Sequence, residues 1–222
     1  MIAQQIAIDG PAGAGKSSVS KRVADRLGYL YIDTGAMYRA IALLALRAGV
    51  PFDDETALTA LAEHADLQLH PAPGGCRVML NGEDVSEKIR LPEVGNAASP
   101  VSACGGVRKA LVAMQQAMAK QQQVVMDGRD IGTVVLPDAA CKIFLTAAPR
   151  ERAKRRALEL EGKGLPVDID AIEQEIAARD HRDSTRSNSP LRQAEDAVLV
   201  DNSNMTIEQT VEKIIALAGA AK

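Results

Sequence analysis

The sequence is poor in aromatic residues, with no Trp, three Tyr and two Phe among 222 residues. Its core must therefore be built from Ala, Val, Ile, Leu and Met at helical or strand spacing. Hydrophobic residues make up 46% of the chain and charged residues 25%, which excludes the collagen-like, disordered and disulfide-stapled classes. The length predicts one medium domain that carries an insertion, since two full domains would be cramped.

Cysteine is also scarce, and Cys76, Cys104 and Cys141 are far apart in the chain. They have no metal-binding spacing and are odd in number, which favours a reducing compartment and a role as small core residues. No run approaches the roughly 18 to 20 apolar residues of a membrane span, and the N-terminus lacks the pattern of a signal peptide. We therefore expect a cytoplasmic protein that does not associate with a membrane.

The chain has no excess of basic residues, because 26 Lys and Arg oppose 29 Asp and Glu and give a formal net charge of -3. Proteins that bind nucleic acids through general electrostatics usually carry a basic excess. We therefore expect no nucleic-acid partner, and any site for a polyanion must be local. No apolar stripe is left over for a dimer interface, which favours a monomer.

Strand and helix patterns alternate along most of the chain, which predicts an α/β fold with a parallel sheet. The glycine-rich turn at 10–15 follows the first strand, and a second turn is expected at 33–35. Thr206 is expected to cap the last helix, an amphipathic one. The expected strands are 2–8, 29–32, 124–126, 142–145 and 197–200, and the other expected helices are 17–27, 36–48, 107–122, 149–161 and 168–182.

The region from 53 to 106 differs in character and is interpreted as an inserted subdomain. A helix is expected to residue 65, followed by short strands at 67–70 and 76–80, and Asn81-Gly82 is a strong hairpin signal. The two charged helices at 149–161 and 168–182 are separated by Gly162-Lys163-Gly164. We expect this helix pair to be exposed and mobile.

Residues 10–17 read GPAGAGKS and fit the pattern G-x-x-x-x-G-K-[ST] between a strand and a helix. Glycines let backbone N–H groups wrap around a phosphate, Lys16 reaches the β- and γ-phosphates, and Ser17 can ligate Mg²⁺. Asp127 ends a hydrophobic strand and suits a role in holding Mg²⁺, directly or through water, although a simple strand cap is the alternative. The absence of an Asn-Lys-x-Asp element argues against a GTPase.

Five arginines lie at loop and helix positions near the expected carboxyl edge of the sheet, where ligands of such folds bind. A dianionic phosphate acceptor requires bidentate guanidinium groups from several directions, because two anions must be held together against their repulsion. The alternative for any one of them is solvated helix surface. These residues are Arg39, Arg108, Arg129, Arg179 and Arg186.

In these motifs the chain resembles the bacterial-type cytidylate (CMP) kinases, a family of P-loop nucleoside monophosphate kinases, over nearly its whole length. The resemblance implies a P-loop three-layer fold with a central parallel sheet, an inserted monophosphate-binding subdomain at 37–106 and a small lid at 149–165. The core is then 1–36, 107–148 and 166–222. Ser18 stands where Thr is common in the family, and Gln116 replaces a frequent arginine. The motifs are residues 10–18, DTGAMYR at 33–39, Ala98-Ser99, Val107-Arg108, DGRDIGTVV at 127–135, and Arg179-Asp180 through Arg186 with Pro190-Leu191.

The resemblance also implies roles for individual residues. ATP is expected to contact Gly10, Pro11, Ala12, Gly13, Ala14, Gly15, Lys16, Ser17, Ser18, Arg152 and Arg156. The CMP phosphate is expected to contact Thr34, Arg39, Arg129 and Arg186, the base Ser99, Arg108 and Asp130, and the ribose side Arg179 and Asp183. Lys16, Arg39, Arg129 and Arg186 form the expected catalytic set. For Arg152 and Arg156 the alternative is an ion-pair lattice with Glu151, Glu159 and Glu161.

The base-reading set is chemically reasonable, because cytosine presents an exocyclic amine beside N3 and O2 acceptors. Uracil replaces that amine by a carbonyl, which would face the Asp130 carboxylate with lone pairs opposed. The implied reaction is Mg²⁺-assisted transfer of the γ-phosphoryl group of ATP to CMP, and to dCMP, in pyrimidine nucleotide metabolism. No role is assigned to His64, His70 or His181.

Two alternatives to this function stay open. The first is a kinase for another acceptor, such as UMP, AMP or shikimate. The second is a regulator that binds a nucleotide and transfers nothing, which leaves the arginine set unexplained.

Overall fold

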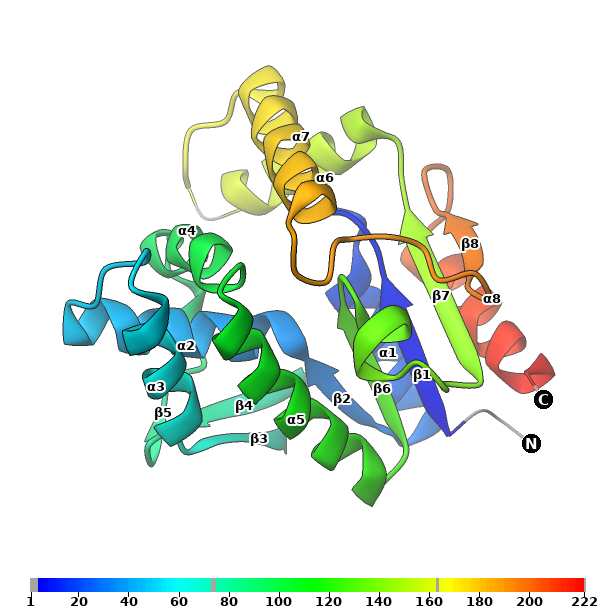
Figure 1. The fold of residues 1–222 in the computed structure, drawn as a ribbon. Coiled ribbons are helices and arrows are strands. Elements are labelled where there is room, and N and C mark those ends of the chain that lie inside the picture. Colours follow the sequence, from blue (N-terminus) through cyan, green and yellow to red (C-terminus); the bar gives the residue numbers. More distant parts are fainter. Residues whose placement is uncertain (1–3, 73–74, 163, 222) are drawn as a thin grey trace. The chain divides into compact units, whose positions relative to one another are not determined.

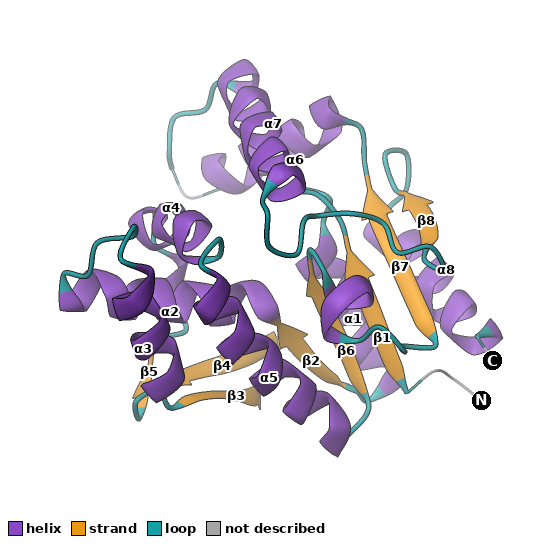
Figure 2. Cartoon of the chain, in the orientation of Figure 1, coloured by secondary structure: helices purple, strands orange, loops and turns teal. Residues whose placement is uncertain are grey.

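The computed structural model describes residues 4–72, 75–162 and 164–221 (Figure 1). The chain forms two compact units, unit 1 from Met1–Gly28 with Val125–Lys222, and unit 2 from Tyr29–Val124. Its strands form a five-stranded sheet in the order β2-β6-β1-β7-β8 and a three-stranded sheet in the order β3-β4-β5. Figure 2 shows helices together with strands, and the predicted α/β class with a central parallel sheet is confirmed.

Unit 1 is organised around β1, whose residues Ile6, Ala7 and Ile8 are completely buried. A continuous apolar run is typical of a parallel strand that is covered on both faces. Strand β1 pairs in parallel with β7, which in turn pairs in parallel with β8. The elements of this unit are β1 (Gln5–Asp9), α1 (Lys16–Leu27), β6 (Val124–Gly128), η2 (Ile131–Val135), β7 (Cys141–Thr146), α6 (Pro149–Glu161), α7 (Ile169–Thr185), β8 (Val198–Asp201) and α8 (Ile207–Ala220).

The ends of the helices in unit 1 follow local sequence signals. Helix α1 ends at Gly28, whose φ of 69° is the left-handed conformation that glycine adopts without steric cost. Thr206 and Gln209 form a capping box at the start of α8, as the sequence predicted for Thr206. Of the strand predicted at 2–8, residues 2 and 3 lie outside the described residues, and β1 begins at Gln5.

Helices α6 and α7 lie side by side (Figure 1) and share a small apolar core. That core contains Ala153 and Ala157 of α6, Ile172 and Ile176 of α7, and Ala12. The expectation that this pair is exposed is therefore wrong for its inner face, because alanine and isoleucine residues at helical spacing are buried there. Lys163, which was expected to lie in the connection between the two helices, is outside the described residues.

Unit 2 consists mainly of helices that accompany the three-stranded antiparallel sheet. The predicted turn at Asn81-Gly82 is confirmed, since both residues have positive φ, 50° and 80°, and Leu80 pairs with Glu83 across it. The elements of this unit are β2 (Leu30–Asp33), α2 (Thr34–Ala48), α3 (Glu55–His64), β3 (Leu67–Ala72), β4 (Gly75–Leu80), β5 (Glu83–Asp84), η1 (Lys88–Arg90), α4 (Pro92–Val101) and α5 (Gly105–Gln121).

Two features of unit 2 differ from the sequence prediction. The turn expected at 33–35 is the first turn of α2, because the Asp33 carboxylate caps the helix by accepting the Ala36 N–H at 2.9 Å. Helix α4 was not predicted, since it contains Gly95 and Pro100, which are poor helix formers. It forms because its apolar face, which includes Val94 and Val101, is buried and packs against α2.

None of the helices in the described ranges combines the length and the apolar character that crossing a membrane requires.

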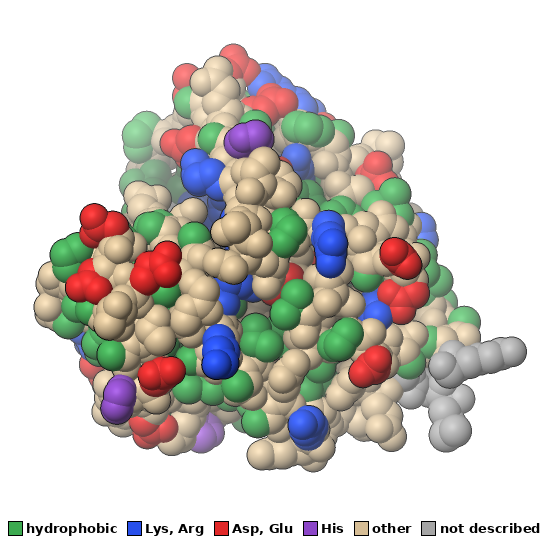
Figure 3. All heavy atoms as spheres, in the orientation of Figure 1, with side chains coloured by type: hydrophobic (Ala, Val, Ile, Leu, Met, Phe, Trp, Pro, Cys, Tyr) green, Lys and Arg blue, Asp and Glu red, His purple; other side chains and the backbone are tan. Residues whose placement is uncertain are grey.

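Figure 3 shows one face of the molecule, on which Lys and Arg side chains are scattered together with Asp and Glu side chains among neutral ones. This mixture agrees with the small formal net charge of -3.

Candidate functional site

Residues 10–15 connect β1 to α1, as predicted, and their conformation depends on three glycines. Gly10, Gly13 and Gly15 have positive φ values of 152°, 74° and 84°. A Cβ added to Gly10 would lie 2.0 Å from the backbone oxygen of Leu145, so that only glycine fits there. We call residues 10–17 the phosphate loop.

Lys16 begins α1 and is almost fully buried. Its Nζ donates hydrogen bonds to the carbonyl oxygens of Gly10 and Pro11, both at 2.7 Å. Burial lowers the pKa of Lys16 well below its usual value, and the nearby Arg129 guanidinium lowers it further. The two hydrogen bonds place the amino group of Lys16 inside the phosphate loop. A bound anion would stabilise its charged form and so oppose the lowering of its pKa.

Ser17 and Asp127 come together at the start of α1 and the end of β6. The Ser17 hydroxyl donates a hydrogen bond to Asp127 Oδ2 at 2.9 Å. A hydroxyl and a carboxylate are hard oxygen ligands of the kind that Mg²⁺ prefers. In the described part of the chain no group of three or more His, Cys, Asp or Glu could hold a metal ion.

A cluster of charged side chains in unit 1 contains five of the residues that were expected to contact CMP. Arg129 Nε donates to Asp183 Oδ2 at 2.8 Å, and Arg186 Nη2 lies 3.8 Å from Asp130 Oδ1. Burial alone would raise the pKa of Asp183. The surrounding arginines outweigh burial and hold this pKa below its usual range, and Arg129 makes the largest contribution among them. The members are Arg129, Asp130, Arg179, Asp183 and Arg186, which we call the arginine cluster.

Asp9 is a site residue that the sequence interpretation missed. Its carboxylate accepts the backbone N–H groups of Ile131 and Gly132 at 2.8 and 2.7 Å, directly after Asp130 in the chain. Burial raises the pKa of Asp9 to about 6, although these two hydrogen bonds oppose the rise. The signal that could have indicated it is an acidic residue at the end of an otherwise apolar strand, immediately before the phosphate loop.

The remaining residues that were expected to contact CMP belong to unit 2. Thr34 is buried in the first turn of α2, and Ser99 is half-buried on α4. Arg39 Nη1 donates to the carbonyl of Ile89 at 3.3 Å. Arg108 is buried, and its Nη1 donates to the carbonyl of Ser102 at 3.2 Å.

Two side chains of unit 2 that the sequence interpretation did not single out accompany this set. The guanidinium of Arg108 lies over the ring of Tyr38, 5.3 Å from its centre, an arrangement that stabilises a cation. Arg90 donates to Asp33 Oδ2 at 2.9 Å. Asp33 therefore joins the start of α2 to η1.

Arg152 and Arg156 have different surroundings although both lie on α6. Arg152 is buried, and its Nη1 donates to the carbonyl of Ala12 in the phosphate loop at 2.8 Å. Arg156 is exposed and pairs with Glu159 at 2.9 Å, as the ion-pair alternative predicted for it, whereas Glu151 pairs with Lys154. Of the two arginines, Arg152 thus contacts the loop and Arg156 forms a surface ion pair.

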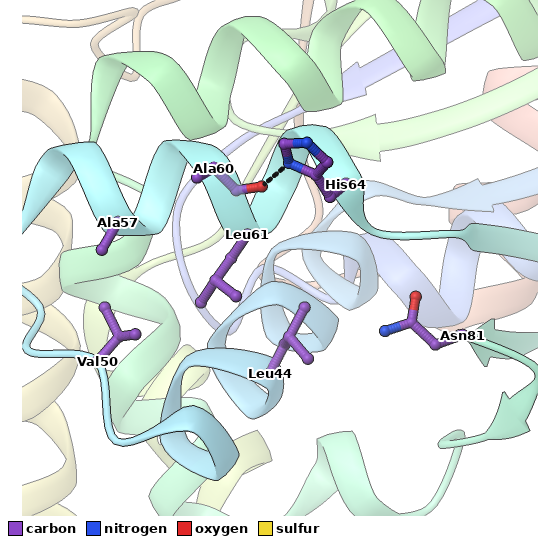
Figure 4. A pocket seen from close by; sticks show the side chains of 7 residues that line it. All are labelled: Leu44, Val50, Ala57, Ala60, Leu61, His64 and Asn81. Carbon is purple, nitrogen blue, oxygen red and sulfur yellow. Dashed lines mark hydrogen bonds between the residues drawn. The ribbon is translucent and has the colours of Figure 1, made fainter.

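A pocket of about 440 Å³ in the described part of the chain contains none of the predicted site residues. It lies in unit 2, where Figure 4 shows the side chains of Leu44, Val50 and Leu61 turned toward a common space. His64 borders it and is hydrogen-bonded through Nδ1 to the carbonyl of Ala60 at 2.8 Å. The pocket is an open and mainly apolar depression, whereas the charged groups of the predicted site lie in the phosphate loop and the arginine cluster.

Comparisons with known proteins agree on one family. The family model described as cytidylate kinase matches residues 6–220. The cytidylate kinase of Caldicellulosiruptor saccharolyticus is 53% identical over 212 residues, and that of Caldicellulosiruptor bescii is 52% identical, each covering 96% of this chain and 94% of the relative. The shikimate kinase of Bacteroides thetaiotaomicron has a similar fold, with a TM-score of 0.51 at 15% sequence identity, covering 97% of this chain and 98% of that chain.

Proposed function

Because the chain belongs to the cytidylate kinase family, we propose that it transfers the γ-phosphoryl group of ATP to CMP, and also to dCMP. The observation that carries the proposal is the arginine cluster in the same unit as the phosphate loop. Several guanidinium groups near the buried Lys16 repel one another, and bound phosphates would relieve that repulsion. A nucleotide-binding regulator would have no use for this second set of cations.

On the donor side, residues 10–18 hold the ATP phosphates through backbone N–H groups and the start of α1. Lys16 exchanges the carbonyls of Gly10 and Pro11 for phosphate oxygens, since an ammonium binds an anion more strongly than a neutral carbonyl. Arg152 stabilises the loop by donating a hydrogen bond to the carbonyl of Ala12. Arg156 would contact ATP only after its ion pair with Glu159 breaks.

Ser17 and Asp127 would hold Mg²⁺, directly or through its water shell. The ion would neutralise charge on the donor phosphates. The hydrogen bond between the two side chains supports this role, because it orients both oxygens before any ligand binds. With so few protein ligands, phosphate oxygens and water would supply the others.

On the acceptor side, Arg39, Arg129, Arg186 and Thr34 hold the CMP phosphate, and Arg179 and Asp183 the ribose side. Ser99, Arg108 and Asp130 read cytosine. Two contacts support the roles of Arg108 and Asp130: the guanidinium of Arg108 lies over Tyr38, and Asp9 accepts a hydrogen bond from the backbone N–H that follows Asp130. The acceptor phosphate oxygen is already anionic, so positioning and charge neutralisation suffice without a general base.

We also propose that the protein works as a monomer in the cytoplasm, without nucleic-acid or membrane partners. The net charge of -3 supports the absence of a nucleic-acid partner. The free thiols of Cys76, Cys104 and Cys141 fit a reducing compartment, and burial raises the pKa of Cys141 to about 11, which keeps that thiol protonated.

The direct test is ADP release from ATP and Mg²⁺ with CMP, dCMP, UMP, AMP and shikimate as acceptors. We expect turnover with CMP and dCMP and much weaker turnover with UMP. Preferred turnover of UMP, AMP or shikimate would reassign the acceptor, and tight ATP binding without acceptor-stimulated ADP release would favour the regulator.

The Lys16→Ala variant tests the donor assignment. It should lose about 10³-fold in kcat/KM, because a cation at the transferred phosphoryl group contributes roughly 4 kcal/mol to the transition state. Circular dichroism should show a folded protein, since the substitution removes a buried charge rather than a packed apolar group. Near-normal turnover would contradict the role of Lys16.

A further inference from the structure

Ala12 of the phosphate loop contacts α6 and α7 through its methyl group, its carbonyl and its N–H. Its methyl group belongs to the apolar core that α6 and α7 share. Its carbonyl accepts a hydrogen bond from Arg152 Nη1 at 2.8 Å, and its N–H donates to Asp180 Oδ1 at 2.9 Å. The neighbouring Gly13 also packs closely, since an added Cβ would lie 3.1 Å from Arg152 Cβ.

Asp180 connects these contacts to one another. While Oδ1 accepts the Ala12 N–H, Oδ2 accepts a hydrogen bond from Arg152 Nη1. Arg152 in turn donates through Nε to the carbonyl of Ala147 at 3.0 Å, which fixes its guanidinium plane. One carboxylate thus neutralises a buried arginine and orients one peptide group of the loop.

A similar but separate arrangement holds Ala14. Asn202 Nδ2 donates to the Ala14 carbonyl at 3.1 Å, and Arg155 fixes Asn202 by donating to its side-chain oxygen at 3.0 Å. A loop that turns its N–H groups toward phosphates must turn carbonyls outward, and buried carbonyls need donors. At Ala12 the N–H itself also points outward, and it is held by Asp180.

We infer that Asp180 is a positioning residue for the donor phosphates: it fixes the Ala12 peptide and Arg152 together, and so joins the phosphate loop to α6 and α7. This inference rests on the proposed function only in taking ATP as the ligand of the loop. Asp180 acts through the loop backbone. Its loss should therefore weaken ATP binding, although an acidic side chain has been removed from near a polyanion.

The sign of that effect separates positioning from simple electrostatics. If Asp180 acted only as a nearby negative charge, its removal would strengthen ATP binding, because the repulsion between like charges would fall. If it fixes the loop, its removal leaves the Ala12 N–H and the Arg152 guanidinium without their acceptor, and the loop loses its bound geometry.

The experiment compares wild type with Asp180→Ala and with Asp170→Ala by calorimetric titration of ATP and, separately, of CMP. Asp170 lies on the same helix but is exposed and pairs with Arg150, so its variant removes the same charge away from the loop. We expect the Kd of ATP to rise about tenfold in Asp180→Ala. The Kd of CMP in Asp180→Ala, and the Kd of either nucleotide in Asp170→Ala, should stay within twofold of wild type. Unchanged or tighter ATP binding would overturn the inference, as would an equal loss for ATP and CMP.

If Asp180→Ala does not fold, as judged by circular dichroism, Asp180→Asn replaces it. The amide keeps one acceptor oxygen for the Ala12 N–H but cannot accept from Arg152 with its other atom, so a smaller rise in the ATP Kd is expected, with the same control and the same overturning outcomes. ATP binding is measured without acceptor. A wild-type protein that binds ATP but fails to phosphorylate CMP would therefore refute the proposed function and still decide the role of Asp180.

Discussion

At the scale of single residues, burial acts on the charged groups next to the phosphate loop in opposite directions. It raises the pKa of the Asp9 carboxyl and lowers the pKa of the Lys16 ammonium, so that each group is pushed toward its neutral form. Asp9 nevertheless accepts two backbone N–H groups, and Lys16 donates to two carbonyls. These bonds orient the groups while leaving Lys16 able to gain a stronger anionic partner.

The raised pKa of Asp9 predicts a specific pH dependence of stability. Because the folded-state pKa is about 6 against 3.8 for the unfolded chain, the stability that protonated Asp9 contributes is complete below about pH 4 and is lost as pH rises through about 6. The unfolding free energy of wild type minus that of Asp9→Asn should therefore fall by an amount on the order of 3 kcal/mol across this window.

Urea titrations of wild type and Asp9→Asn at pH 4, 5, 6 and 7 measure this difference, in which the contributions of carboxylates that do not interact with Asp9 cancel. A difference that stays flat with pH, or that rises, would show that Asp9 does not titrate as its burial requires. Activity is not needed for this comparison.

At the scale of elements, the close contact between α3 and α5 depends on Gly106. A Cβ added there would lie 1.9 Å from Thr59 Oγ1 and 2.6 Å from its Cγ2, far inside van der Waals contact. Thr59 cannot turn away freely, because its hydroxyl donates to the Glu55 carbonyl at 2.6 Å. Arg108, which is proposed to read the base, lies on α5 two residues after Gly106. The contact between Gly106 and Thr59 therefore fixes the start of the helix that carries Arg108.

Gly106→Ala should accordingly destabilise the protein by about 1 to 3 kcal/mol, the usual cost of overpacking, despite the better helix propensity of Ala. Gly219→Ala is the control, because nothing lies within 4 Å of its added Cβ in α8, and it should be neutral or slightly stabilising. Thermal unfolding measures both. Combining Gly106→Ala with Thr59→Ala should recover part of the loss, and an undiminished loss would mean that the clash with Thr59 is not its cause.

At the scale of the whole molecule, the two units divide the proposed tasks. Unit 1 contains the phosphate loop and the arginine cluster, and unit 2 contains Arg39, Ser99 and Arg108. The folded chain is proposed to bind CMP, so that acceptor binding should stabilise the folded state. Binding to the folded state alone raises the unfolding free energy by mass action.

At a CMP concentration of about 100 times its Kd, the gain should be about 2.7 kcal/mol, or roughly 5 to 10 °C in Tm for a chain of this size. UMP at the same concentration should give a clearly smaller shift, because its carbonyl would face the Asp130 carboxylate. Differential scanning calorimetry measures both shifts. Equal shifts for the two nucleotides would count against the base-reading set of Ser99, Arg108 and Asp130.

The local features of this protein were predictable from sequence because each depends on neighbouring residues in the chain. The phosphate loop is a pattern of eight consecutive residues, the Asn81-Gly82 hairpin is a dipeptide, and the cap at Thr206 needs only the next turn of helix. The alternation of strands and helices likewise follows from short-range periodicity, and the family resemblance follows from the motifs themselves.

Contacts between distant segments were decided only by the tertiary structure. Helix α4 forms against its own propensity because burial of Val94 and Val101 outweighs Gly95 and Pro100. Asp9 meets Ile131, and Asp180 meets Ala12, across 122 and 168 residues of chain. No local pattern encodes such pairs, since the free energy that forms them comes from packing and from the need of buried polar groups for partners.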